Sequence, residues 1–268
     1  MVEPAGQVHF RAYGTSFAIR ATDDELLGAA RARAVMLGWC QSSATAGEVR
    51  YAFRRVTTAD SRGSPLYHLT CDGEVVRSSP DFDAVIEAFE DHAKIQTAAR
   101  SSAMLFVHAG VVAWRGRGIL IPGRSRAGKS TLVHALLREG AEYYSDEFAL
   151  LDPEGRVHPY PVPLSLRADR SAPSRRVQAE ALGASTAQSP TFVDVILATQ
   201  YRRRARWRPQ PLSKGEAFLV LMDNTVAARQ PPARTMPVLR EAVLRAAAWR
   251  SWRGEAQPAA RQLLASIT

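Results

Sequence analysis

The sequence of 268 residues predicts an α/β fold: a small α+β module over residues 1–100, followed by a larger mixed sheet with flanking helices over residues 101–268. Three observations predict it. Short apolar runs alternate with helical patterns along the chain. At Met104 the pattern changes, and closely spaced apolar runs begin. One of these runs leads through a glycine-rich loop directly into an apolar helical pattern, which is the order strand, loop, helix.

The composition is that of a folded protein with a basic excess. Apolar residues make up 46% of the chain, too many for a disordered protein. The formal net charge of +9 comes from 35 Lys and Arg against 26 Asp and Glu. Arginine supplies almost all of it, because the lysines are Lys94, Lys129 and Lys214 alone. The excess is explained either by compositional bias or by a surface for nucleic acid or an acidic substrate.

The cysteine content, the N-terminal sequence and the most apolar run predict a cytoplasmic location and no membrane partner. Cys40 and Cys71 form neither a disulfide framework nor a metal-ligand spacing, so a reducing compartment suits them. The N-terminus lacks a basic region followed by an apolar stretch, which argues against a secretory signal. The most apolar run, residues 103–114, is shorter than the about 20 residues that a spanning helix needs.

The N-terminal module is predicted to hold strands and two helices. Asp72-Gly73 is a hairpin signal between two strand-like runs, and Ser79-Pro80-Asp81 precedes a long helical pattern. The elements expected in order are a strand at 10–19, a helix at 23–39, strands at 50–56, 65–71 and 74–77, and a helix ending near residue 99. No chemistry is predicted for this module.

The C-terminal part is predicted to alternate strands and helices around the loop. Gly140 stands where a left-handed helix cap is usual. The expected strands are 105–107, 111–114, 119–121, 142–145, 148–151, 157–160 and 191–199, and the expected helices are 132–137, 215–224, 238–252 and one from residue 258. Residues 167–190 are predicted to be a mobile loop with one short helix.

Gly123 opens the pattern Gly-x-x-x-x-Gly-Lys-Ser, which ends at Ser130. This is the P-loop pattern, in which backbone N–H groups and a helix N-terminus bind phosphates. Lys129 is expected to reach the terminal phosphates and the Ser130 hydroxyl to bind Mg²⁺. The alternative is an ordinary glycine-rich turn. The predicted nucleotide-binding residues are Gly123, Arg124, Ser125, Arg126, Ala127, Gly128, Lys129, Ser130 and Thr131.

The first acidic candidates for the second motif of a nucleotide site come one helix and one short strand after the loop, at Asp146 and Glu147. A helix that leaves the loop and a strand that returns would bring both carboxylates beside Lys129 and Ser130. One acid could then hold Mg²⁺ while the other accepts a proton from an attacking hydroxyl. The candidate metal ligands are therefore Ser130, Glu147 and Asp146. The alternative is a capping or turn pair at the surface.

His108-Ala-Gly110, a hairpin, the run Gly-x-Leu-Ile-x-Gly-x-Ser-x-x-Gly-Lys-Ser, and the acidic pair together resemble the catalytic domain of HPr kinase/phosphorylase. The resemblance covers residues 104–167 well and the rest loosely. It implies a P-loop core of the HPr kinase/phosphoenolpyruvate carboxykinase type, an enzyme that phosphorylates a protein serine, and a homo-oligomer. It also implies that Asp146 is the general base, that Glu147 binds magnesium, and that His108 lies near the transferred phosphate. A buried neutral histidine between strands is the alternative for His108.

The sequence departs from this family in two places. Arg126 stands where the family has glycine, and the later Glu-x-Arg-Gly signature has no clear counterpart. The nearest segment, residues 163–167, has Ser165 where an acid is expected. This departure puts the additional metal ligand and the phosphorylase activity in doubt. It favours a divergent branch that includes kinases of a serine in ribosomally made peptide precursors, such as lasso peptides. Arg167 is a candidate phosphate contact.

Arginines gather at two places. Arg124 and Arg126 lie in the phosphate loop, where guanidinium groups could bind phosphates or an acidic acceptor. Residues 202–208 interleave five arginines with Trp207, a pattern seen in nucleic-acid strips. One short strip without a nucleic-acid-binding fold favours a solvated or phosphate-facing loop instead, so nucleic acid is not an expected partner.

The function predicted from these features is an ATP- and Mg²⁺-dependent kinase that phosphorylates a hydroxyl, with a serine of a peptide or small protein as its partner. A small-molecule hydroxyl is an alternative acceptor. A nucleotide-dependent regulator or nucleic-acid-linked NTPase is an alternative of another class. A third is an inactive descendant that binds peptide without catalysis.

Overall fold

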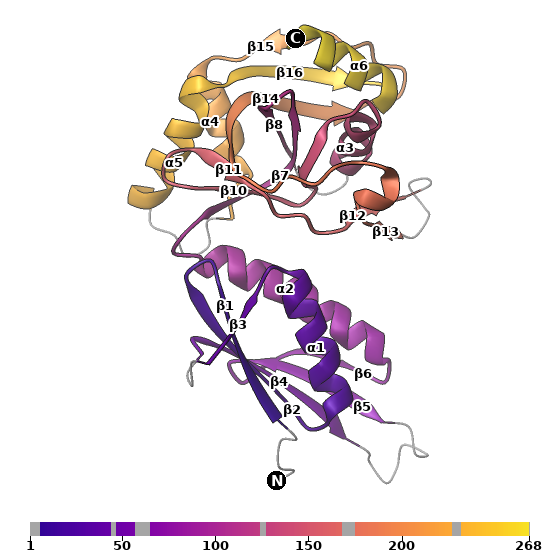
Figure 1. Cartoon of the computed structure of the whole chain (residues 1–268), viewed down its shortest axis with the longest axis vertical. Coiled ribbons are helices and arrows are strands. Elements are labelled where there is room, and N and C mark those ends of the chain that lie inside the picture. The colour runs from indigo at the N-terminus through magenta and orange to yellow at the C-terminus, as the bar shows by residue number, and fades with distance from the viewer. Residues whose placement is uncertain are drawn as a thin grey trace. The chain divides into compact units, whose positions relative to one another are not determined.

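The computed structural model describes residues 6–43, 47–56, 65–123, 127–167, 175–226 and 232–267 (Figure 1). It is a mixed α/β protein with two compact units, Met1–Ala103 and Met104–Thr268. No helix within the described ranges has the length and apolar character needed to cross a membrane.

The first unit is a six-stranded sheet in the order β3-β1-β2-β4-β5-β6, with two helices that share one hydrophobic cluster with it. Only the β2–β4 pairing is parallel. The helices begin at acidic N-caps, Asp23 and Asp81, whose side chains accept backbone hydrogen bonds. The elements are β1 Gly6–Ala12, β2 Thr15–Ala21, α1 Asp24–Met36, β3 Cys40–Ser42, β4 Val49–Val56, β5 Leu66–Cys71, β6 Glu74–Ser79 and α2 Phe82–Arg100.

The predicted single strand at 10–19 is wrong, because the chain turns within it. Tyr13 and Gly14 both have left-handed backbone angles, with φ of 50° and 87°, and join β1 to β2. Two left-handed residues in succession are typical of the tight hairpin turn. The apolar alternation continues on both sides of the turn, so the pattern alone does not reveal it. The hairpin at Asp72-Gly73 and both helices of this unit are confirmed.

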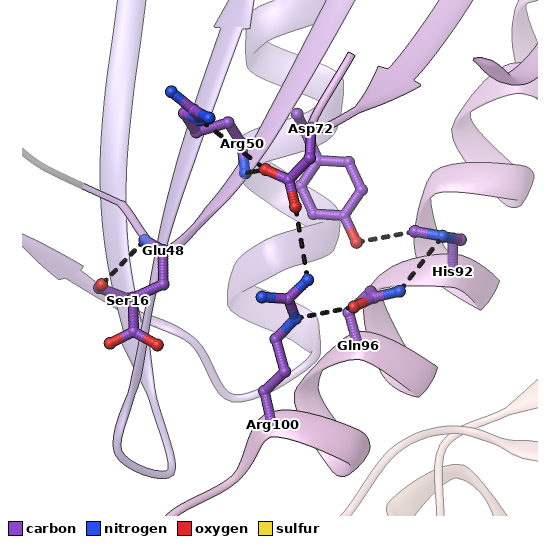
Figure 2. A network of polar contacts seen from close by, with 8 residues as sticks. Ser16, Glu48, Arg50, Asp72, His92, Gln96 and Arg100 are labelled. Atoms are coloured by element: carbon purple, nitrogen blue, oxygen red, sulfur yellow. Dashed lines mark hydrogen bonds and ion pairs between the residues drawn. The ribbon is translucent and has the colours of Figure 1, made fainter. Parts of the chain in front are cut away.

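A polar network joins α2 to the sheet of this unit (Figure 2). The Asp72 carboxylate accepts a hydrogen bond from the Arg50 backbone at 3.0 Å and lies 3.4 Å from the Arg100 guanidinium. Arg100 Nε also donates to Gln96 at 2.9 Å, and Gln96 contacts His92 at 3.5 Å. The network therefore fixes the last turns of α2 against the β5–β6 turn.

The second unit is an eight-stranded sheet in the order β11-β10-β7-β8-β14-β16-β15, with β9 paired to β7. Strand β11 pairs with both β10 and β14, so five strands close on themselves. Strand β14 runs parallel to β8 and β16. The strands are β7 Leu105–Trp114, β8 Arg117–Pro122, β9 Glu142–Ser145, β10 Phe148–Leu151, β11 Arg156–His158, β14 Thr191–Tyr201, β15 Gln210–Pro211 and β16 Ala247–Arg253, with a separate pair β12 Leu164–Leu166 and β13 Arg175–Val177.

Helices cover both faces of this sheet (Figure 1). One core cluster includes the inner faces of α4 Lys214–Asp223 and α5 Pro232–Arg245, and the other includes α3 Lys129–Arg138 and α6 Ala256–Ser266. The two clusters take alternate residues of the central strands, such as Leu120 on one side and Ile119 on the other. The side that carries α3 is the side of the phosphate-loop sequence.

Two predictions for this unit are wrong. Residues 105–107 and 111–114 are one strand, β7, because His108 and Gly110 between them keep extended pairings with Phe148 and Ile121. The predicted helix at 238–252 ends at Arg245, and β16 follows it. Alanine favours a helix in isolation, but here the parallel pairing with β14 prevails, and burial in β16 alternates as in a strand.

The loop predicted at 167–190 contains more structure than expected. Within the described residues it includes β13 and a short 3₁₀ helix at Glu180–Leu182. Residues 168–174 lie outside the described ranges.

Candidate active site

The phosphate-loop sequence connects the end of β8 at Pro122 to the start of α3 at Lys129. Arg124, Ser125 and Arg126 lie outside the described residues. Gly128 caps α3 in the left-handed conformation, with φ of 88°. A Cβ atom there would stand 2.5 Å from Arg253 Nη2. Glycine is therefore required at this position both by the backbone angle and by the space.

Lys129 is buried and reaches back across the loop. Its side chain is 7% exposed, and its Nζ donates to the Gly123 carbonyl at 2.7 Å. The same Nζ lies 3.1 Å from His108 Nε2. Burial lowers the pKa of Lys129, and the nearby carboxylates of Asp146 and Glu147 oppose that shift. The structure thus places an ammonium group at the first residue of the loop.

His108 accepts a hydrogen bond from this ammonium group. Burial, and then the charge of Lys129, lower the pKa of His108 to about 4, so the imidazole is neutral at pH 7. An ammonium group has donors only, so Nε2 must be the acceptor and the ring proton must be on Nδ1. The backbone of His108 accepts from the Gly123 N–H at 3.2 Å. This one residue therefore contacts both ends of the described loop.

Asp146 lies in the turn between β9 and β10 and is 8% exposed. Its Oδ2 accepts a hydrogen bond from the Ser165 backbone at 3.3 Å, whereas its buried Oδ1 has no hydrogen-bond partner in the described part of the chain. Burial raises the pKa of Asp146 to about 7. The hydrogen bonds from Ser130 and Ser165 and the charge of Lys129 limit that rise. An acid tuned in this way can accept a proton near neutral pH.

Ser145 shapes the turn that presents the two acids. It is fully buried, and its Oγ accepts hydrogen bonds from the backbones of Glu147 and Phe148, both at 3.2 Å. The Glu147 carbonyl accepts from the Ala109 N–H on β7 at 3.2 Å. Glu147 is half-buried beside Asp146. The acidic pair is therefore held by backbone contacts rather than left as a surface turn.

Gly110 on β7 lets α3 approach the strand. A Cβ atom at Gly110 would stand 2.6 Å from Val133 Cγ2 and 4.0 Å from Asp146 Oδ1. Any side chain would displace α3 and fill the space beside the unpartnered carboxylate oxygen. The His-x-Gly spacing in the sequence thus places the histidine and this space on the same face of one strand.

The residues at this site fit the magnesium ion that the sequence predicts. The described residues contain no group of three or more His, Cys, Asp or Glu able to hold a metal ion. Magnesium in phosphate-transfer sites uses one or two carboxylates together with phosphates and water, so the acidic pair is sufficient. The carboxylates of Asp146 and Glu147 and the neighbouring Ser130 hydroxyl offer oxygen donors of the type that Mg²⁺ prefers.

The remaining predicted residues lie at the margin of this site. Ser130 is half-buried and Thr131 is exposed, both in the first turn of α3. Arg167 is exposed after β12, two residues beyond the Ser165 N–H that binds Asp146. Ser165 thus contributes its backbone at the position where the resemblance called for an acid.

The sequence gives no indication of the two residues that support the loop from the C-terminal strands. Arg253, at the end of β16, is 1% exposed, and its Nη2 donates to the Gly128 carbonyl at 2.5 Å. Tyr201, at the end of β14, donates its backbone N–H to the Ala127 carbonyl at 3.3 Å. Burial lowers the pKa of Arg253, which nevertheless stays charged. Arg253 and Gly128 are 125 residues apart in the sequence, so no local motif predicts their contact.

No family model matches the chain, and no curated protein matches it. Among solved structures, the chain is similar to the HPr(Ser) kinase/phosphatase from Coxiella burnetii. The two share 13% identity with a TM-score of 0.33, over 60% of this chain and 93% of that one. This is a distant likeness that does not establish a family.

Proposed function

We propose that this protein is an ATP- and Mg²⁺-dependent kinase that transfers the γ-phosphoryl group to a hydroxyl, with a serine of a peptide or small protein as the acceptor. The observation that carries the proposal is the buried Asp146 carboxyl. One of its oxygens is unpartnered, and it lies near the lysine of a P-loop sequence. A binding switch needs the loop and a metal, whereas transfer to a hydroxyl also needs a base.

The loop from Gly123 to Thr131 would bind the nucleotide phosphates. The N-terminus of α3 supplies backbone N–H groups and partial positive charge. Lys129 would exchange its contacts with Gly123 and His108 for phosphate oxygens. Mg²⁺, held by Ser130 and Glu147 with Asp146 beside them, would neutralise charge on the phosphates.

Asp146 would take the proton from the acceptor. The acceptor oxygen forms a bond to the γ-phosphorus, the bond from that phosphorus to the β–γ bridging oxygen breaks, ADP leaves, and the hydroxyl proton moves to the carboxylate. The Ser165 N–H holds Oδ2, which would leave Oδ1 as the oxygen that accepts the proton. His108 accepts a hydrogen bond from Lys129 before the nucleotide binds, and as a neutral imidazole it would add no competing positive charge beside the phosphates.

The test is incubation of the protein with ATP, Mg²⁺ and serine-containing peptides, followed by mass spectrometry for a phosphate-sized increase. Asp146→Asn should lower transfer by about a hundredfold or more while ATP binding survives, since a general base contributes on that scale. Lys129→Ala should weaken both binding and transfer.

Glu154→Gln is the matched control, because Glu154 is an exposed acid in the β10–β11 turn of the same unit. It should leave transfer unchanged. Transfer at the wild-type rate by Asp146→Asn would refute the assigned base. Phosphate release that no hydroxyl acceptor captures would favour a nucleotide hydrolase instead.

A further inference from the structure

A loop rich in arginine, with no acidic partners in the part of the chain that the structure describes, begins directly after β14. We call residues 202–208 the arginine loop. Five of its seven residues are arginine, and all five side chains are exposed: Arg202, Arg203, Arg204, Arg206 and Arg208. Such a density of one charge in a short segment is electrostatically unfavourable unless an anion compensates it.

The backbone of the arginine loop is anchored to β16. The Arg202 N–H donates to the Arg253 carbonyl at 2.9 Å, and the Arg208 N–H donates to Ser251 Oγ at 3.1 Å. Gly254 leaves room for the loop, since a Cβ atom there would stand 2.7 Å from the Ala205 carbonyl oxygen. The loop is thus fixed by its main chain, and its arginine side chains are not needed to hold it.

The guanidinium groups of the arginine loop have no acidic partner within the described residues. Other arginines of the chain do pair with acids, for example Arg156 with Asp152 at 2.8 Å and Arg261 with Glu139 at 2.8 Å. The Arg202 guanidinium of the arginine loop lies 5.8 Å above the centre of the Trp252 ring. The remaining guanidinium forks are available for carboxylates or phosphates.

The arginine loop starts next to the candidate active site. Tyr201, the residue before it, bonds to Ala127 of the phosphate loop, and Arg253, which holds its first N–H, bonds to Gly128. We infer that the arginine loop binds an acidic segment of the acceptor peptide that flanks the phosphorylated serine. This inference rests on the proposed kinase function and specifies its substrate as an acidic peptide.

A single-stranded nucleic acid fits this surface less well than an acidic peptide. Strand binding needs successive aromatic platforms for the bases. Trp207 packs against the core cluster of α3 and α6, and Arg202 lies over the Trp252 ring. Carboxylates need only the guanidinium forks, which this loop supplies in number.

The test uses the full chain and a synthetic peptide with one serine flanked by glutamates, beside a neutral counterpart with glutamines. In the variant with Arg203→Gln, Arg206→Gln and Arg208→Gln, the KM for the acidic peptide should rise about tenfold, the scale of a few exposed charge pairs. The kcat, the affinity for ATP and the KM for the neutral peptide should stay within about threefold of wild type. These three side chains are exposed and form no ion pair with the described residues, so the fold should survive.

A matched control removes the same charge elsewhere. Arg11, Arg20 and Arg54 are exposed on strands of the first unit, and their joint replacement by glutamine should leave the KM unchanged. Equal KM effects in both triple variants, or equal KM values for both peptides, would overturn the inference. So would an oligouridine that binds more tightly than the acidic peptide and is lost in the arginine-loop variant.

Peptide binding without ATP separates this inference from the proposed function. Fluorescence anisotropy of the labelled acidic peptide should show binding that weakens with salt and in the arginine-loop variant. Such binding without phosphorylation would refute the kinase and support the arginine loop as an acidic-peptide site. Phosphorylation of the acidic peptide with an unchanged KM in the arginine-loop variant would support the kinase and refute the arginine loop as its peptide site.

Discussion

Three titratable side chains of the candidate site are tuned by the same burial in different directions. Burial raises the pKa of Asp146 to about 7 and lowers the pKa of His108 to about 4, while the pKa of Lys129 is also lowered. At pH 7 the site therefore holds a carboxyl poised to titrate, a neutral imidazole and a cation. Groups with pKa values shifted in this way are candidates for proton transfer.

The rate of transfer should depend on pH through Asp146. The base must be ionised, so kcat/KM should rise with pH and level off above about 7. His108 titrates near pH 4 and adds no limb in this range. Deprotonation of Lys129 should lower the rate on the alkaline side, which gives a bell-shaped profile. The measurement is kcat/KM against pH; a profile that stays flat from about pH 5 to 8 would exclude Asp146 as the base.

Gly110→Ala should destabilise the second unit. The new methyl group would stand 2.6 Å from Val133 Cγ2, and overpacking of this kind costs about 1–3 kcal/mol. Gly215→Ala in α4 is the control, because a Cβ there meets nothing within 4 Å and alanine favours a helix. Urea unfolding measures both. Val133→Ala combined with Gly110→Ala should recover part of the loss; an unaltered midpoint in Gly110→Ala would contradict the close approach.

At the scale of elements, residues at the ends of β14 and β16 form hydrogen bonds to the main chain of the P-loop sequence. Tyr201 binds Ala127 and Arg253 binds Gly128, so the left-handed Gly128 is fixed by strands far along the chain. Arg253 Nη1 also donates to the Gly254 carbonyl at 3.0 Å. One planar guanidinium group thus links the loop to the strand end, a task that a lysine cannot perform with the same geometry.

Arg253→Lys should therefore weaken ATP binding. A loss of about tenfold in affinity is expected from a buried, charge-assisted hydrogen bond to the loop. Arg250→Lys is the matched control, because Arg250 is an exposed residue of the same strand. Calorimetry gives the affinity, and hydrogen exchange of residues 127–131 reports the loop itself. Equal affinities for ATP in the two variants would show that the Arg253 contact does not contribute to ATP binding.

The sequence predicts correctly the elements that are marked by residues close to them in the chain. The hairpin at Asp72-Gly73, α2 and the strand–loop–helix order around Gly123 have turn residues, caps or motifs within a few positions. Strand β16 and the uninterrupted β7 depend on pairing with distant strands, and their alanine and glycine residues favour other local structures, so the local sequence does not predict them. Lys129, His108 and Asp146 were expected together and lie together, although their catalytic roles stay predictions.

At the scale of the whole molecule, the net charge of +9 is distributed unevenly. Some arginines of the first unit pair with acids, as Arg33 does with Glu90 at 3.3 Å. Arg253 is buried under the phosphate loop, and five more arginines gather in the arginine loop without acidic partners among the described residues. The net charge of the sequence does not distinguish paired, buried and partnerless arginines, because the fold decides which acids lie near each arginine.

The support from β16 also sets the order in which the site matures during synthesis. The ribosome releases residues 123–131 long before residues 247–253, and the Gly128–Arg253 contact spans 125 positions. A nascent chain that has already made β8 and α3 therefore still lacks the strand that holds Gly128. If the proposed function holds, full nucleotide affinity is therefore expected only after β16 has paired with β14, late in the synthesis of the chain.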